Sequence, residues 1–397
     1  MAEATGRLQW RRAIGRIVAA AGALVLANCA GVVPREPAPT PPPPVARPAP
    51  PRPVTPGIPD DVERHRVALL VPLSGANAGV GRSLANATQL ALLDTRNERI
   101  RITTYDTASG AAAAATRAIA DGNRLILGPL LAEDVRAVAP IARRAEVPVL
   151  SFSNDVSVAG DGAFVLGYAP AQSIERVVEH ARRSGVTAFA GLVPTGVYGD
   201  RASTALLRSV ESAGGQVVGI QTYDRSGGSV AAAVTRLSRT SPYQAVLIAD
   251  SAGTAAGAMP ALRRSARSAR VLGTELWNTD SGVGGATALN GAWFASVSNT
   301  LYRQYATKYR TRFGAAPYRL SSLGYDAVLL TVRIARDWRV GDEFPASRLT
   351  DRDGFAGLDG AFRFSRDGVA ERALEVQEIR GGATVTVSPA PQGFGGR

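Results

Sequence analysis

The stretch from Leu125 to Asp155 constrains the fold of this chain more than any other. It contains two short apolar runs, Leu125–Leu127 and Val147–Leu150, on either side of Glu133–Arg144, where apolar residues recur at helical spacing. Buried strands that flank an amphipathic helix form a βαβ unit, and such units build parallel sheets. Open α/β sheets bind ligands at the carboxyl ends of their strands. The loops after both runs are therefore candidate site loops.

Composition limits the partners of the chain. Its 397 residues, 45% of them hydrophobic, predict two lobes with sizeable cores plus tails. The formal net charge is +12, carried almost entirely by arginine, because Lys308 is the only lysine. These arginines are scattered along predicted helices, whereas a nucleic-acid binder typically has one dense patch with interleaved aromatic residues. We therefore expect no nucleic-acid partner, and a diffuse basic surface that favours anionic envelope polymers or lipid head groups.

Histidine and cysteine are too rare for several kinds of site. The chain has two histidines, His65 and His180, and one cysteine, Cys29. A zinc site built from Cys and His is excluded, and a histidine-based triad is hard to build. We expect no metal, no cofactor and no enzymatic activity.

The amino-terminal sequence is typical of an export segment. Residues 1–28 combine an arginine-rich start with a short apolar region, Ile17–Ala27, which falls well short of the ~20 residues that span a bilayer. The following Leu26-Ala27-Asn28-Cys29 resembles the bacterial lipobox, which implies that Cys29 is lipidated and begins the mature chain. Ala30 in the next position implies sorting to the outer membrane, with anchoring by lipid alone.

A proline-rich tether, residues 29–65, precedes the folded part. Pro34–Pro59 contains thirteen prolines and almost no apolar bulk. Such a segment favours extended polyproline II, so it is predicted to hold the folded part away from a membrane. A proline-rich ligand for another domain is the alternative.

The folded part is predicted to begin at Arg66 with repeated strand–helix units, which break at Ala169-Pro170 and then restart. Two helices, Leu301–Phe313 and Ser321–Trp338, follow the last of these units. A terminal hairpin is predicted to pair Ala361–Phe364 with Leu374–Arg380 around an Asp-Gly turn. The glycine-rich loop at 72–81 departs from both common phosphate-binding motifs, so a nucleotide site is not expected.

This order resembles the type I periplasmic binding fold of the leucine-binding family, and within it the penicillin-binding protein activator lipoproteins. The resemblance covers 66–391 and rests on these segments: VALLVPLSG from Val67, ILGPL from Ile126, 139–155, VYGDR from Val197, GYDAV from Gly324, and LDGAFRFSRDGVAERALEVQEI from Leu358. It implies an α/β fold of two Rossmann-like lobes with a ligand cleft between them. The three crossings would lie near Ala169, near Val297 and within Arg339–Phe355. The first lobe would hold 66–168 and 299–340, and the second 169–298 and 341–397.

The resemblance also implies ligand residues. Amino-acid binders hold the ligand carboxylate with loops after the third and fourth strands, where this chain has Ser151, Ser153 and Asn154 but also the hydroxyl-free Pro129-Leu130-Leu131. Tyr198 matches the aromatic residue of the second lobe. The acidic residue that pairs the ligand ammonium is expected just after Ala245–Ala249, where Asp250 is the nearest carboxylate.

Four of the cleft candidates have a structural alternative. Tyr198 is a ligand platform or packs at a strand end, and Trp277 lines the cleft rim or belongs to the core. Asp250 and Ser74 are cleft residues or helix N-caps, a position that both residue types favour.

The preferred interpretation is a non-enzymatic lipoprotein that regulates peptidoglycan synthesis through contact with a synthase, a penicillin-binding protein. The alternative is the substrate-binding protein of an ABC permease for branched-chain amino acids or amides. A third interpretation is a sensor of glycans or muropeptides, so an amino-acid-like or muropeptide ligand stays open.

Overall fold

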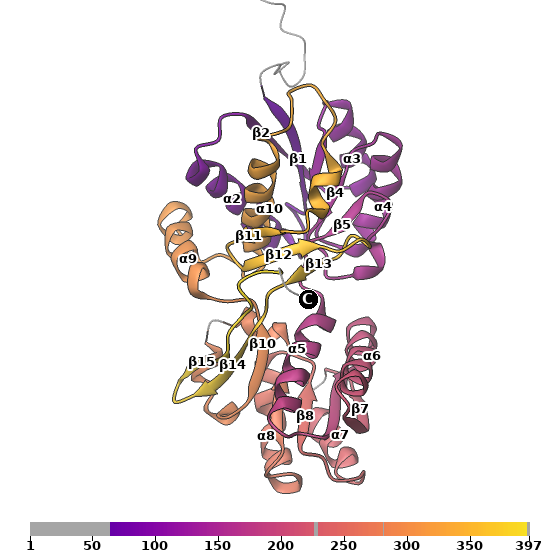
Figure 1. Cartoon of the computed structure of the whole chain (residues 1–397), viewed down its shortest axis with the longest axis vertical. Coiled ribbons are helices and arrows are strands. Elements are labelled where there is room, and N and C mark those ends of the chain that lie inside the picture. Colours follow the sequence, from indigo (N-terminus) through magenta and orange to yellow (C-terminus); the bar gives the residue numbers. More distant parts are fainter. Residues whose placement is uncertain (1–63, 226–228, 281, 395–397) are drawn as a thin grey trace, which may run out of the picture. The chain divides into compact units, whose positions relative to one another are not determined.

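The computed structural model describes residues 64–225, 229–280 and 282–394, which fold as two α/β lobes (Figure 1). The expected export segment, Cys29 and nearly all of the tether lie outside these residues. No helix within the described ranges is long and apolar enough to cross a membrane.

The first lobe is built on a five-stranded parallel sheet in the order β2-β1-β3-β4-β5. Its strands are β1 (His65–Val71), β2 (Ile100–Asp106), β3 (Leu125–Leu127), β4 (Val149–Ser151) and β5 (Ala163–Val165). Its helices are α2 (Ala78–Thr95), α3 (Ala111–Ala120), α4 (Ala132–Arg144), α9 (Thr300–Phe313) and α10 (Ser321–Ile334), with the short η1 (Val156–Val158) after β4. The opening βαβ unit is therefore present as β3-α4-β4.

Strand alternation distributes the helices over both faces of this sheet. Val67, Leu69 and Val71 belong to the core cluster shared with α2 and α10, whereas Ala68 and Leu70 belong to the cluster shared with α3 and α4. Successive side chains of a strand point to opposite faces, and a strand buried on both faces needs apolar residues throughout. The run VALLV at the first strand meets that requirement.

The second lobe is built on a seven-stranded sheet in the order β15-β14-β10-β9-β8-β6-β7. Its strands are β6 (Ala188–Pro194), β7 (Gln216–Tyr223), β8 (Ala245–Ile248), β9 (Arg270–Gly273), β10 (Trp293–Ser296), β14 (Glu375–Arg380) and β15 (Ala383–Ser388). Its helices are α5 (Pro170–Arg183), α6 (Val197–Ser212), α7 (Ser229–Leu237) and α8 (Ala252–Ser265), followed by the short η2 (Glu275–Thr279), η3 (Val283–Gly285) and η4 (Thr287–Leu289). Helices α5 and α6 cover one face, and α7 and α8 cover the other.

One boundary predicted from the sequence is wrong. Residues after Arg339 were expected to cross into the second lobe, yet Phe344, Leu349 and Phe355 pack in the core cluster of the first lobe. They belong to η5 (Ala346–Thr350) and to a three-stranded sheet, β11 (Phe355–Gly357), β12 (Gly360–Phe364) and β13 (Ala370–Arg372), drawn beside the first lobe in Figure 1. The chain makes this last crossing between β13 and β14, because burial of Phe344, Leu349 and Phe355 keeps the preceding segment on the first lobe.

The terminal hairpin also differs from the prediction. Strand β12 pairs antiparallel with β13 rather than with Leu374–Arg380. The turn at Asp367-Gly368 is present as expected, with Gly368 at φ 80°. Strand β14 instead pairs with β10 and β15. The last strand, β15, was not predicted from the sequence, because its side chains are largely exposed and give no apolar pattern.

In each lobe, a glycine near the start of the helix that follows the lobe's first strand lets that helix pack closely against the strand end. A Cβ on Gly81 would lie 1.7 Å from the carbonyl oxygen of Pro72, and one on Gly199 would lie 1.7 Å from that of Pro194. Both contacts join the first turns of a helix to the strand end before it. Only glycine permits this approach of α2 to β1 and of α6 to β6.

Candidate functional site

A cavity of about 310 Å³ lies between the lobes, where the chain crosses from one to the other. Crossing residues Ala169, Val297 and Leu374 line it, together with loops from both lobes. Its apolar lining includes Leu130, Leu131, Phe152, Leu276 and Leu320. Its polar lining includes Asn154, Tyr168, Gln172, Ser173, Glu275, Asn278, Arg319 and Arg372. This size is at the lower end of small-molecule pockets, which are mostly apolar with a few polar groups.

The two serines expected to hold a ligand carboxylate serve the loop instead. Ser151 is fully buried, donates to the carbonyl of Pro129 at 3.1 Å and accepts from the backbone N–H of Ser153 at 3.0 Å. The hydroxyl of Ser153 accepts from the backbone N–H of Asp155 at 3.1 Å. Neither serine is among the residues that line the cavity. Of the three residues proposed for this cradle, only the exposed Asn154 reaches the cavity.

Asp250 is also held away from the cavity. Its carboxylate accepts from Tyr223 and pairs with Arg225, each at 3.0 Å, and it accepts from the backbone N–H of Ser251 at 2.7 Å. The N-cap of α8 is Ser251, whose hydroxyl accepts from Thr254 at 3.2 Å, so the N-cap alternative for Asp250 is wrong by one residue. Asp250 does not line the cavity.

Ser74 and Trp277 do not line the cavity either. Ser74 is exposed and lies 3.3 Å from Asp106, while the N-cap position of α2 is Asn77, so Ser74 is not that N-cap. Trp277 is fully buried in the core and donates to the carbonyl of Asp250 at 3.0 Å, as its structural alternative predicted.

Tyr198 is half-buried, and its hydroxyl lies 3.0 Å from both Thr274 and Glu275. This places Tyr198 behind the cavity wall as a support for Glu275, which does line the cavity. Ser173 of α5 also donates to Glu275. Burial raises the pKa of Glu275, whereas the hydrogen bonds from the hydroxyls of Ser173 and Tyr198 act to lower it. This carboxylate was not predicted from the sequence, although it follows the end of β9 at the edge where ligands bind.

A buried ionic cluster closes the first-lobe side of the cavity. Arg319 pairs with Asp359 at 2.8 Å, and Arg372 approaches Asp326 at 3.9 Å. The hydroxyl of Tyr168 donates to Asp359. Burial, and then the negative charge of Asp359, raises the pKa of Asp326 to about 7. Burial opposes ionisation of Asp359 too, but Arg319 and Arg372 hold its pKa below the ordinary range.

One ion pair joins the two lobes directly. Asp155, in the loop after β4, pairs with Arg201 of α6 at 2.7 Å and with Arg136 of α4 at 2.8 Å. Burial opposes ionisation of Asp155, but the donors of Ser157 and Arg201 lower its pKa to about 2. Arg201 belongs to the VYGDR segment that carried the resemblance, where its role was not predicted.

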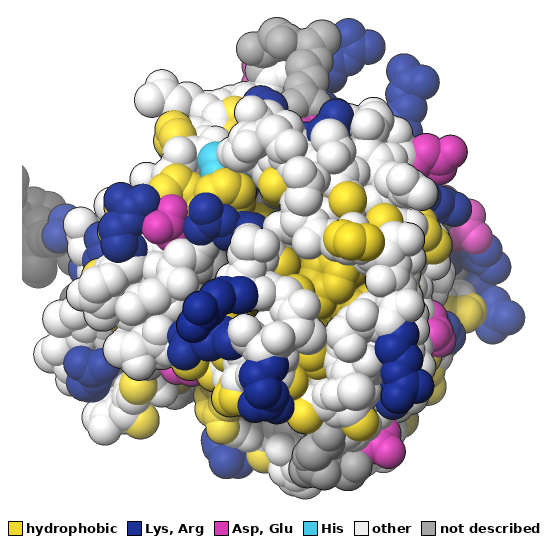
Figure 2. Space-filling model, turned by 90° about the horizontal axis from the view of Figure 1, so that it is seen from below, with side chains coloured by type: hydrophobic (Ala, Val, Ile, Leu, Met, Phe, Trp, Pro, Cys, Tyr) yellow, Lys and Arg dark blue, Asp and Glu magenta, His cyan; other side chains and the backbone are white. Residues whose placement is uncertain are grey.

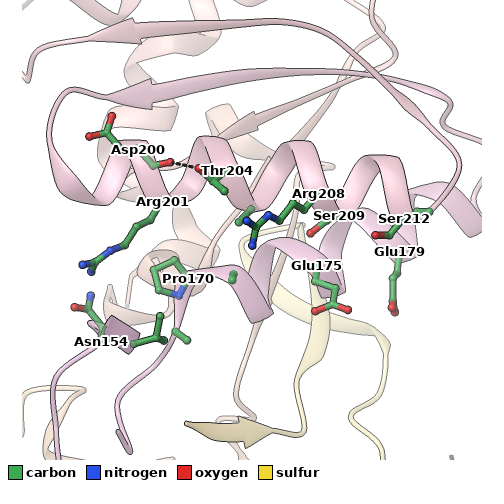
Figure 3. A pocket seen from close by; sticks show the side chains of 15 residues that line it. Asn154, Pro170, Glu175, Glu179, Asp200, Arg201, Thr204, Arg208, Ser209 and Ser212 are labelled. Carbon is green, nitrogen blue, oxygen red and sulfur yellow. Dashed lines mark hydrogen bonds between the residues drawn. The ribbon is translucent and has the colours of Figure 1, made fainter. Parts of the chain in front are cut away.

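A second cavity of about 610 Å³ lies between α5 and α6 (Figure 3). Figure 3 shows Glu175 and Glu179 on α5, Arg208 on α6, and Arg201 extending toward Asn154. Its opposite walls therefore carry charges of both signs. Figure 2 shows one end of the molecule, where Lys and Arg side chains are scattered as the sequence predicted.

These features define a class of protein. Two α/β lobes, one on a parallel sheet and one on a mixed sheet, enclose a small cavity at their crossings and form a two-lobed binding protein of type I architecture. Residues 65–383 match the family described as periplasmic binding protein, and the chain belongs to this family. The expected type I periplasmic binding fold, and membership of the periplasmic binding protein family, are therefore confirmed.

Solved structures of related fold include transport and regulatory proteins. A putative branched-chain amino acid ABC transporter protein from Rhodospirillum rubrum is 23% identical, with a TM-score of 0.70, over 82% of this chain and 100% of its own. The C-domain of LpoA from Haemophilus influenzae, a regulator of PBP1A, is 19% identical, with a TM-score of 0.64, over 81% of this chain and 99% of its own. Full-length LpoA is 20% identical, with a TM-score of 0.64, over 82% of this chain and 59% of its own.

One curated relative is an uncharacterised protein of Rickettsia prowazekii, RP748. It is 27% identical over 142 residues, which are 35% of this chain and 38% of that protein. The alignment thus spans well under half of the relative.

Proposed function

We propose that this protein is a non-enzymatic envelope lipoprotein that contacts a peptidoglycan synthase and stimulates it. In this proposal Cys29 is lipidated and anchored in the outer membrane, and the proline-rich tether lets the folded lobes reach the cell wall. The fold serves as a contact surface rather than as a carrier of amino acids.

The proposal rests on the side chains that were expected to bind the charged groups of an amino acid. Ser151 donates to the carbonyl of Pro129 in the neighbouring loop, Ser153 accepts from the backbone N–H of Asp155, and neither serine lines the cavity. Asp250 is paired with Arg225. A zwitterion bound here would need a new partner for its carboxylate, since burying an unpaired charge is costly. The likeness to the LpoA C-domain, described as a regulator of PBP1A, also supports a regulatory function. Because 59% of full-length LpoA is covered, the shared part is the binding-protein domain, and we place the synthase contact on that domain.

The second candidate is a substrate-binding protein of an ABC transporter for branched-chain amino acids or amides. The cavity of about 310 Å³ favours it, because it keeps apolar walls from both lobes and the carboxylate of Glu275. Transport proteins of this fold, such as the one from Rhodospirillum rubrum, also support it.

Affinity capture from an envelope extract distinguishes the two. We expect the tagged protein to recover a bifunctional peptidoglycan synthase. Recovery of an ABC permease alone, together with micromolar leucine binding by calorimetry, would reverse the ranking. Mass spectrometry of the mature amino terminus tests the anchor separately, and we expect a diacylated or triacylated Cys29.

A further inference from the structure

We propose that the groove between α5 and α6 is the docking surface for one α-helix of the synthase, a helix with an apolar stripe, one acidic edge and one basic edge. This inference rests on the proposed synthase contact and adds the surface and the chemistry of the partner segment. The groove is the cavity of about 610 Å³ in Figure 3. It shares only Asn154 and Ala169 with the lining of the smaller cavity between the lobes.

Two neighbouring helices with small side chains form the groove. Helices α5 and α6 cover the same face of the second-lobe sheet, where Val177 of α5 and Leu206 of α6 belong to one core cluster. The side chains that line the groove between them are small, as at Ala171 of α5 and at Ala205 and Ser209 of α6. They leave room for the larger side chains of a third helix, which packs in such a groove at an axis distance of about 8–10 Å.

The two walls of the groove carry opposite charges. Glu175 and Glu179 line it from α5, and Arg201 and Arg208 line it from α6, as Figure 3 shows. Arg201 pairs with Asp155 at 2.7 Å, whereas the exposed Arg208 takes part in no ion pair among the described residues. A helix docked here therefore needs basic side chains over α5 and acidic side chains over α6. This complementarity fixes its orientation.

Exposed apolar side chains gather around the same groove. Val156 of the first lobe lines it and is 42% exposed, while α6 itself displays Val197 at 63% and Leu207 at 49%. These are three of the seven large hydrophobic side chains exposed in the described part of the chain. Single exposed hydrophobic residues are ordinary, but a group of them beside a groove marks a protein interface. A synthase docked through the groove would cover them.

The groove also reaches both lobes. Asn154 and Val156 belong to the first lobe, and the rest of the lining comes from the crossing at Ala169 and from α5 and α6. A helix seated along the groove would contact both lobes, so docking stabilises the lobe arrangement in which Asp155 pairs with Arg201.

Surface plasmon resonance with an immobilised, purified bifunctional peptidoglycan synthase tests the groove. Thr204 is exposed, lines the groove, and donates to the carbonyl of Asp200 at 3.0 Å. Thr204→Trp fills the groove, so the full-length variant should bind at least tenfold more weakly. The matched control is Thr307→Trp on α9, where an exposed threonine donates to the carbonyl of Arg303 at 3.0 Å, and its affinity should be native.

Two further experiments test the chemistry of the partner helix. Arg208→Glu places an acid opposite the acidic edge of that helix, so binding should weaken at least tenfold. Arg310→Glu, the same change at an exposed position of α9, should leave binding unchanged. A photo-crosslinking amino acid in place of Thr204 should join the protein to one helix of the synthase, which mass spectrometry identifies by its sequence.

The outcomes separate the docking surface from the proposed function. Native affinity of both Thr204→Trp and Arg208→Glu, with native unfolding midpoints, would overturn the groove as the surface and leave the synthase contact standing. Crosslinking from position 204 to a second copy of this chain, or to a synthase segment that is not helical, would also overturn it. No binding of the synthase by the native protein would overturn the proposed function, and this inference with it.

Discussion

The ion pair between the lobes yields the most quantitative prediction, for Asp155→Asn. Asp155 is 5% exposed, and its pKa falls from 3.8 to about 2. A shift of nearly two units corresponds to about 2 kcal/mol of stability. Asparagine keeps an oxygen that can accept from the backbone N–H of Ser157, which lies 2.9 Å from Asp155, so the variant removes charge and little else. The side chains of Arg136 and Arg201 are 57% and 31% exposed, so water still solvates both arginines after the substitution. We therefore assign most of the lost stability to removal of the buried Asp155 charge.

The pH dependence gives this prediction its test. A lowered pKa in the folded state contributes stability that is present above pH 3.8 and is lost as the pH falls through about 2. Urea unfolding followed by far-UV circular dichroism should show Asp155→Asn less stable by about 2 kcal/mol at pH 7, with a gap that narrows toward pH 2. The control is Asp161→Asn, whose exposed pair with Arg143 at 2.9 Å predicts a change below about 0.5 kcal/mol. A loss for Asp155→Asn that is the same at pH 3 and pH 7 would refute the electrostatic reasoning.

Three further predictions concern stability, each measured by urea unfolding. Glu275→Gln should be more stable than the native protein, increasingly so as the pH rises above 4.5, because a raised pKa makes ionisation costly in the folded state; a constant gap would contradict this. Asp359→Asn should lose about 3–5 kcal/mol, since it leaves Arg319 buried without its counter-charge, and a loss below 1 kcal/mol would contradict the ion pair. Gly199→Ala should lose at least about 2 kcal/mol because its Cβ would lie 1.7 Å from the carbonyl of Pro194, whereas Gly257→Ala, which has open space, should not.

The strand–helix repeats could be predicted because apolar runs and helical periodicity are local properties of the sequence. The stretch from Leu125 to Asp155 folds as the βαβ unit that its pattern indicates. The last crossing could not be predicted in this way. Residues 339–355 are largely polar and irregular, so the segment reads as a linker, and only tertiary packing reveals that Phe344 and Leu349 are buried in the first lobe.

The candidate site was harder to predict, because hydrogen bonds between neighbouring loops decide which side chains are free. Ser151 and Ser153 lie in the expected loop, but Ser151 donates to the carbonyl of Pro129 in the neighbouring loop and Ser153 accepts from the backbone N–H of Asp155. Asp250 was ranked by its distance from β8, while the carboxylate that reaches the cavity, Glu275, follows the next strand of the sheet. The available signal was the acidic residue after Thr274, at the carboxyl end of β9.

We propose that this binding-protein fold regulates a synthase instead of carrying an amino acid. The most direct measurement is the rate of glycan polymerisation by a purified bifunctional peptidoglycan synthase, titrated with the purified protein. We expect a saturable rise in that rate, with leucine present or absent. The proposal would be contradicted if the rate stayed unchanged over the whole titration while the same protein bound leucine with micromolar affinity.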